Sequence, residues 1–106
     1  MSERSLHYNA RAKNDLREII DYYAETAGDF PVHRFLGEMG KAFRHIARAP
    51  GTGSPRYQKE LDAPGIRFWK VTRFPHLVFY VELANAVRIL RVMHGKRDIS
   101  HRFHTA

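Results

Sequence analysis

The densest group of chemically active side chains in the sequence is His94, Lys96 and Arg97, which follows an alternating apolar run ending at Met93. Histidine titrates near neutral pH, and lysine and arginine are positively charged there. Such a group can cut RNA, hold a phosphate, pair with an acidic partner, or simply end a strand. The stretch by itself leaves all four possibilities open.

Other familiar chemistries lack the residues that they need. The chain has no cysteine, which excludes disulfides, thiolate metal sites and cysteine nucleophiles and fits a reducing compartment. The glycine-rich stretch 50–54 lacks the Gly-Lys-Ser/Thr ending of a phosphate loop, so we interpret it as a plain connection. His101 and His104 have helical spacing, but the sequence offers no evident third metal ligand. We expect no metal, no cofactor, and a mobile tail around these histidines.

Positive charge is concentrated towards the C-terminal part of the sequence. The net charge is +7; residues 1–30 hold four Lys or Arg against six acidic residues, whereas residues 66–106 hold eight against two. Such a field attracts nucleic acid or an acidic protein. Arginine predominates, and its planar guanidinium binds a carboxylate or phosphate at two points, which favours a recognition surface. The cations concerned are Arg67, Arg73, Arg88, Arg91, Lys96 and Arg97.

The elements that must position these groups begin with a strand and two helices. Residues 5–8 alternate as a short strand, and Asn9 is a suitable N-cap for a helix over residues 10–27. A second amphipathic helix begins near residues 29–31 and ends before Pro50. Two such helices with a short link predict an antiparallel hairpin.

After a connection over residues 50–65, the apolar period changes from helical to two. It predicts strands at Ile66–Thr72, Leu77–Glu82 and Val87–His94, and a short helix or an arm over residues 97–103. The order is β-α-α-β-β-β. We therefore expect an α+β fold in one domain over residues 1–106, with the N-terminal strand and helical hairpin packed on a small antiparallel sheet.

This order, together with several motifs, resembles the RelE/ParE superfamily of bacterial toxins from type II toxin–antitoxin systems. The most specific motif is Ile89 to Ile99, ILRVMHGKRDI. The other matching residues are Ala12, Asp15, Leu16, Ile19, Tyr22, Gly65, Arg67, Phe74, Pro75 and Tyr80. The resemblance implies the fold just argued, a role of the kind known from plasmid stabilisation systems, and a cognate antitoxin through which operator DNA would be contacted only indirectly.

The superfamily contains two activities, and this chain keeps only part of one of them. RelE-like members are ribosome-dependent mRNA endonucleases that use a basic cluster, whereas ParE-like members act on DNA gyrase. Lys70 and Arg97 match the nuclease pattern. Leu77 and Phe103 stand where that pattern has an arginine and a tyrosine or histidine, and neither can stabilise a phosphate or transfer a proton. His94, His101 or His104 could substitute.

The resemblance is therefore closer to ParE-like inhibitors of gyrase, which act by protein binding and not by side-chain catalysis. Two alternatives remain: a nuclease with Lys70, Arg97 and His94 as catalytic residues, and a non-toxic degenerate module that only binds its antitoxin. The expected partner-binding residues are Arg67, Trp69, Arg73, Tyr80, Arg91, His94 and Arg97. For Trp69 a core position is an alternative, and for His94 a strand end hydrogen-bonded to backbone.

We expect a cytoplasmic protein with no membrane partner. The N-terminal Met-Ser-Glu-Arg-Ser lacks the apolar core of a signal peptide. No apolar run approaches the ~20 residues that a membrane-spanning helix needs.

Overall fold

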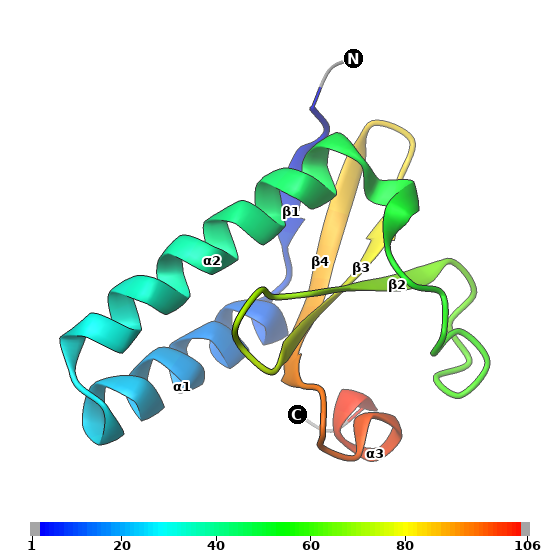
Figure 1. The fold of residues 1–106 in the computed structure, drawn as a ribbon. Helices are drawn as coiled ribbons and strands as arrows, with labels where there is room; N and C mark the ends of the chain where they lie inside the picture. Colours follow the sequence, from blue (N-terminus) through cyan, green and yellow to red (C-terminus); the bar gives the residue numbers. More distant parts are fainter. Residues whose placement is uncertain (1–2, 105–106) are drawn as a thin grey trace.

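In the computed structural model of the protein, which describes residues 3–104, local sequence signals set the ends of two long helices. Helix α1 spans Ala10–Thr26, and the side-chain oxygen of Asn9 accepts a hydrogen bond of 2.9 Å from the Ala12 N–H. Gly28, with φ of 87°, links it to α2, Asp29–Arg48. The helices form the predicted antiparallel hairpin, whose closed end projects beyond the sheet (Figure 1).

Four strands form one sheet in the order β1-β4-β3-β2. Their bounds are Ser5–Tyr8 for β1, Ile66–Lys70 for β2, His76–Glu82 for β3 and Ala86–His94 for β4. The α+β class and the order of elements are confirmed. The sheet is antiparallel only among its three C-terminal strands, because β1 joins it as a parallel neighbour of β4. The N-terminal strand is thus an edge of the sheet and not a layer packed upon it.

A β-bulge in β4 interrupts the alternation that its sequence suggests. Phe79 lies opposite Arg91, but the next residue, Tyr80, lies opposite Ile89, so Leu90 is an extra residue. A bulge of this kind changes the direction of the side chains that follow it. Consequently Ile89 faces the helical hairpin, whereas Arg91 lies on the sheet face of Phe79.

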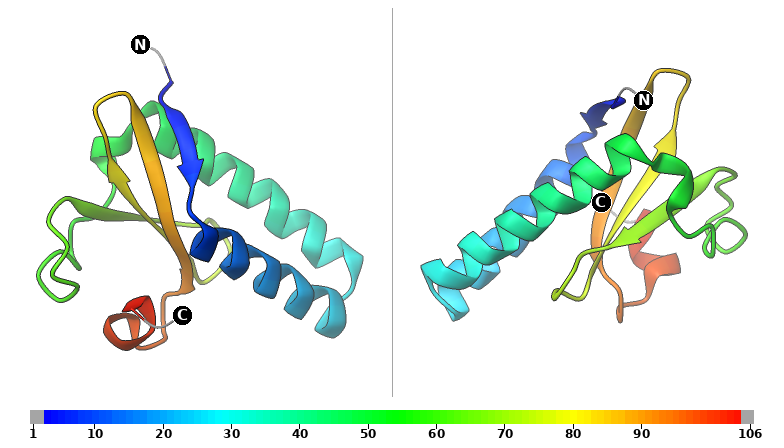
Figure 2. Two further views of the ribbon diagram at one scale, coloured as in Figure 1. Left: turned by 180° about the vertical axis from the view of Figure 1, so that it is seen from behind. Right: turned by 45° about the horizontal axis from the view of Figure 1, so that its top comes forward.

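The sheet carries an apolar core on each face, and Figure 2 shows the elements that lie on the two sides of the sheet. The helical hairpin covers one face, where Phe35 and Ile46 pack against residues of β3 and β4 such as Val78. The other face is covered by the connection before β2 and by α3, Ile99–His104. Members of this second core are Tyr57, Leu61, Ile66, Leu77, Phe79, Met93, Ile99 and Phe103.

Of the two segments without a strong sequence pattern, the connection is mostly irregular, as expected, whereas the expectation of a mobile tail is wrong. The connection that begins with the short 3-10 helix η1, Pro50–Thr52, is a structural layer, because it buries Tyr57 and Leu61. The tail expected to be mobile is the docked helix α3, because Phe103 packs its ring against Phe79 with centroids 5.6 Å apart. Within residues 3–104, no helix is both long enough and apolar enough to cross a membrane.

Candidate functional site

A buried ion pair joins α1 to β4 next to the C-terminal helix. The Nε of Arg91 donates to Oδ2 of Asp15 at 2.8 Å, and its Nη2 donates to Oδ1 at 2.9 Å. Oδ2 also accepts a hydrogen bond of 2.9 Å from the backbone N–H of Val92. Both ionic side chains are almost fully buried. The negative charge of Asp15 therefore balances the positive charge of Arg91. Asp15 also provides a hydrogen-bond acceptor for the Val92 N–H, which lies beyond the part of β4 that pairs with β1.

Arg91 also fixes the C-terminal helix. Its Nη1 donates to the carbonyl oxygens of Arg102 and Phe103, each at 2.9 Å. One guanidinium thus binds α1 on one side and α3 on the other. We expected Arg91 to contact a partner. Instead its side chain is buried, and its guanidinium donates hydrogen bonds to Asp15 and to carbonyl oxygens of α3.

His94 ends β4 and holds the basic turn that follows. Its Nδ1 accepts a hydrogen bond of 3.1 Å from the backbone N–H of Lys96, and its carbonyl accepts one of 3.2 Å from the N–H of Arg97. The interpretation of His94 as a strand-end histidine bonded to backbone is confirmed. Lys96 and Arg97 project from this turn as exposed side chains.

A cleft of about 550 Å³ lies between α1 and this end of the sheet. Tyr22 and Glu18 line it from α1, and His76, His94 and Arg97 line it from the opposite side. The rings of the two histidines meet edge to face, with centroids 5.7 Å apart. The cleft therefore combines an exposed tyrosine, paired imidazoles and a fixed positive charge.

Both histidines are held neutral at physiological pH. Burial lowers the pKa of His76 to about 4, with smaller contributions from His94 and Lys70. The ring of His76 lies among aromatic side chains, 5.4 Å from Phe35, and its Nδ1 is buried without a hydrogen-bond partner. The pKa of His94 is also lowered, first by burial and then by Arg97 and Lys96. Neutral rings do not supply an acid for proton transfer at pH 7.

The other residues expected to bind a partner occupy different environments. Arg67 is partly buried and donates to the carbonyl of Gly53 at 2.8 Å. Trp69 is partly buried against the first core and stacks on His45 with ring centroids 3.8 Å apart. Arg73 is 63% exposed and lies 3.4 Å from the carboxylate of Glu38. Of these three, only Arg73 presents most of its side chain to solvent.

Tyr80 is a core residue and is not available to a partner. Its side chain is fully buried, and its hydroxyl donates to the carbonyl of Pro50 at 2.7 Å. A Cβ on Gly53 would overlap this hydroxyl. The expectation that Tyr80 binds a partner is corrected on this ground: its hydrogen bond fastens η1 to the sheet.

The residues of the nuclease hypothesis are divided between the two faces of the sheet. His94 lies opposite His76, on the face of the helical hairpin. Lys70 lies opposite Leu77, which belongs to the second core, and its Nζ donates to the carbonyls of Val71 and Phe74. Arg97 lines the cleft with His94. Lys70 therefore does not join the other two in one site.

Leu77 and Phe103, the two departures from the nuclease pattern, both belong to the second core. They are 7% and 9% exposed. An apolar core cannot stabilise a phosphorane, because charge development needs donors aimed at it. Within residues 3–104, no group of three or more His, Cys, Asp or Glu residues is placed to hold a metal ion.

A family model described as the ParE toxin of the type II toxin–antitoxin system parDE matches residues 6–99. The chain belongs to this family. It is a ParE-type toxin of a type II toxin–antitoxin system, which confirms the ParE-like resemblance predicted from the sequence. The buried ion pair joins two parts of the sequence that carry the resemblance to the superfamily. Asp15 belongs to the matching residues of the first helix, and Arg91 belongs to the motif Ile89 to Ile99.

Comparison of structures shows the same fold for this ParE-family chain. A chain of a solved structure described as the chromosomal ParDE toxin–antitoxin system from P. aeruginosa matches it with a TM-score of 0.72 and 21% sequence identity. The match covers 87% of this chain and 96% of the other. A search of curated proteins finds no match.

Sequence reasoning missed two members of the site. Asp15 was part of the helical motif, but nothing local marks it as the partner of a residue 76 positions away. The available signal was an acidic residue next to Leu16, close to the apolar stripe of an amphipathic helix. His76 lies just outside the strand predicted at Leu77–Glu82, and the burial that lowers its pKa depends on both helices and β4.

Proposed function

We propose that this ParE-family toxin inhibits DNA gyrase by protein–protein binding and that a cognate antitoxin neutralises it. The observation that carries the proposal is the packing of Leu77 and Phe103. A RelE-like nuclease needs charged or proton-transferring groups at these two places, whereas here both side chains contribute to an apolar core. Inhibition by binding requires only a complementary surface.

The surface that best fits such binding surrounds the cleft beside α1. Arg97 is exposed on the turn after β4, and Tyr22 is 62% exposed on α1. Both line the cleft together with His94. Tyrosine and arginine are over-represented among residues that dominate binding energy. We therefore assign gyrase contact to Arg97, His94 and Tyr22.

The antitoxin in this proposal is an acidic, amphipathic segment that lies along the helical hairpin and reaches the basic C-terminal strands. Exposed charges are screened over ~8 Å at physiological ionic strength. The affinity between toxin and antitoxin should therefore fall as salt is raised from low to physiological concentration. Affinity that is flat across this range would contradict the acidic-segment model.

The experiment that tests the function compares two assays on the purified toxin. Gyrase supercoiling is measured with increasing toxin, with and without antitoxin, and cleavage of mRNA is measured on translating ribosomes. We expect loss of supercoiling that the antitoxin reverses, and intact mRNA. Normal supercoiling at saturating toxin with specific cuts in mRNA would establish the nuclease alternative. Activity in neither assay, with harmless expression in the absence of antitoxin, would establish a degenerate binding module.

The Arg97→Ala variant localises the surface. Arg88→Ala is its matched control, because Arg88 is also an exposed arginine, lies in β4 and does not line the cleft. We expect Arg97→Ala to weaken inhibition of supercoiling and Arg88→Ala to leave it unchanged. Equal inhibition by the two variants would remove Arg97 from the contact surface.

A further inference from the structure

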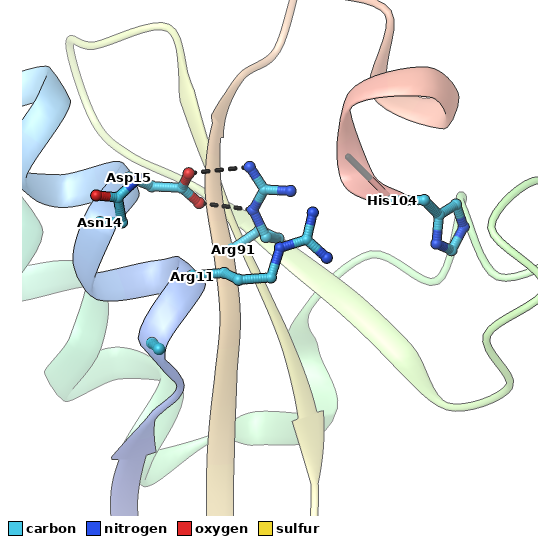
Figure 3. Close-up of a pocket in the computed structure, with 6 residues that line it drawn as sticks. Arg11, Asn14, Asp15, Arg91 and His104 are labelled. Atoms are coloured by element: carbon cyan, nitrogen blue, oxygen red, sulfur yellow. Dashed lines mark hydrogen bonds and ion pairs between the residues drawn. The ribbon is translucent and has the colours of Figure 1, made fainter. Parts of the chain in front are cut away.

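A second hollow shares Asp15 and Arg91 with the tyrosine-lined cleft but lies towards the N-terminal end of α1, where Arg11 and Asn14 line it. Figure 3 shows its lining residues. Its volume is about 420 Å³. Arg11 extends from the first turn of α1 to lie next to Arg91 (Figure 3), and His104 of α3 also lines the hollow. Two arginines and a histidine thus converge on a space that none of the roles described above uses.

The guanidinium of Arg11 is buried in part without hydrogen bonds. Its Nε and Nη2 are inaccessible to solvent and have no acceptor. Buried polar atoms in native proteins are nearly always hydrogen-bonded, and those that are not call for an explanation such as a missing ligand or ion. A charged donor left in this state is especially unfavourable.

The protein itself shows what fits these two atoms. One turn further along α1, Asp15 receives the same pair of atoms, Nε and Nη2, from Arg91, with one carboxylate oxygen on each. This side-on fork matches the spacing of the two oxygens of a carboxylate. Arg11 presents the identical fork with nothing bound to it.

Charge in the hollow also favours an anion. Arg11 and Arg91 bring two positive charges, and among the described residues, 3–104, that line the hollow, Asp15 alone supplies a carboxylate. Its oxygens are already occupied by Arg91 and by the N–H of Val92. One further negative charge would therefore balance the site.

We propose that this hollow receives a single carboxylate, from an aspartate or glutamate of the acidic antitoxin, and that the Arg11 side chain turns so that its Nε and Nη2, which are covered in the free toxin, bind it. The volume exceeds that of a carboxylate, so the side chain that carries the group has room to enter. The preference of the hollow for a carboxylate is inferred only from the geometry of the Arg11 guanidinium. The choice of the antitoxin as its source rests on the proposed function.

The first experiment tests the hollow without any partner. Arginine Nε–H signals of the full chain are followed by NMR during titration with sodium acetate, with sodium phosphate, and with sodium chloride at matched ionic strength. We expect a saturable shift of the Arg11 signal with acetate and, at most, a weaker shift with phosphate. A response to acetate no larger than the response to chloride would overturn the proposal, and a stronger response to phosphate would overturn its carboxylate specificity.

The second experiment asks whether the antitoxin supplies the carboxylate. Arg11→Gln removes the charge, Arg11→Lys keeps the charge but removes the fork, and Lys13→Gln removes an exposed charge from α1 outside the hollow. We expect antitoxin binding to weaken roughly tenfold or more for both Arg11 variants, because two charge-assisted hydrogen bonds are lost. The Lys13→Gln control should bind nearly as the native protein does.

The two experiments fail separately. The native chain could respond to acetate while Arg11→Gln binds the antitoxin with native affinity. That result would exclude the antitoxin as the source of the carboxylate, but it would not contradict the proposed inhibition of gyrase. If Arg11→Lys bound as tightly as the native chain, charge alone would suffice and the two-point contact would be refuted.

Discussion

Removal of the Asp15 carboxylate should destabilise the protein more than any surface change. In Asp15→Ala, Arg91 remains buried, but it loses bonds of 2.8 and 2.9 Å, and the Val92 N–H loses its acceptor. Breaking a buried pair from one side costs about 3–5 kcal/mol. Small domains are stable by about 5–15 kcal/mol, so this variant should lose a large share of its stability. At 4–8 °C per kcal/mol, the melting temperature should fall by roughly 12 °C or more.

The measurement is urea unfolding followed by fluorescence of Trp69, the single tryptophan. Glu18→Ala is the matched control, because Glu18 is an exposed acid one turn further along α1, and its loss should change stability by less than about 0.5 kcal/mol. The double variant Asp15→Leu with Arg91→Met should be more stable than Asp15→Ala, because no charge is left buried. An Asp15→Ala protein within about 1 kcal/mol of the native one would refute the reasoning.

Two further variants test other parts of the fold. Gly53→Ala should lower the free energy of unfolding by about 1–3 kcal/mol, because the added Cβ would overlap the Tyr80 hydroxyl. The control is Gly51→Ala, which has open space around the added Cβ and should stay within about 0.5 kcal/mol of the native protein. Equal unfolding midpoints for the two variants would contradict this prediction. His76 has its pKa lowered to about 4 from 6.5, so the unfolded chain takes up a proton before the folded one does. Stability should be complete above pH 6.5 and fall, by up to about 3 kcal/mol from this residue, as the pH drops from 6.5 to 4. His76→Phe should flatten that part of the curve of unfolding free energy against pH, and a native protein equally stable at pH 7 and pH 5 would rule the explanation out.

The fold was predictable from the sequence because its helices and strands carry local signals. The cap at Asn9, the link at Gly28 and the change of period at Ile66 all lie at the expected positions. The buried role of Arg91 was not predictable in this way. An arginine in a strand with alternating apolar residues suggests an exposed side chain. Arg91 is buried instead, because of the bulge at Leu90 and the distant carboxylate of Asp15.

The site was predictable only where a residue acts through its own neighbourhood. His94 and Arg97 lie on one turn, so their sequence spacing placed them correctly beside the cleft. Tyr80 was expected to bind a partner. The carbonyl that accepts the hydrogen bond of its hydroxyl lies 30 residues away, in a segment without a regular sequence pattern. The second core was missed for the same reason, because Tyr57 and Phe103 come from segments that are too short to show a period.

The parallel pairing of β1 with β4 has a consequence for synthesis on the ribosome. Ser5 pairs with Ala86, about 80 residues later, and within residues 3–104 β1 has no other strand beside it. At translation rates of about 5–20 residues per second, the first strand waits roughly 4–16 s for its partner to be made. During that interval the nascent hairpin has no sheet to cover its apolar stripe. A toxin built in this way completes its sheet, and hence any surface that depends on β4, only after β4 has been translated.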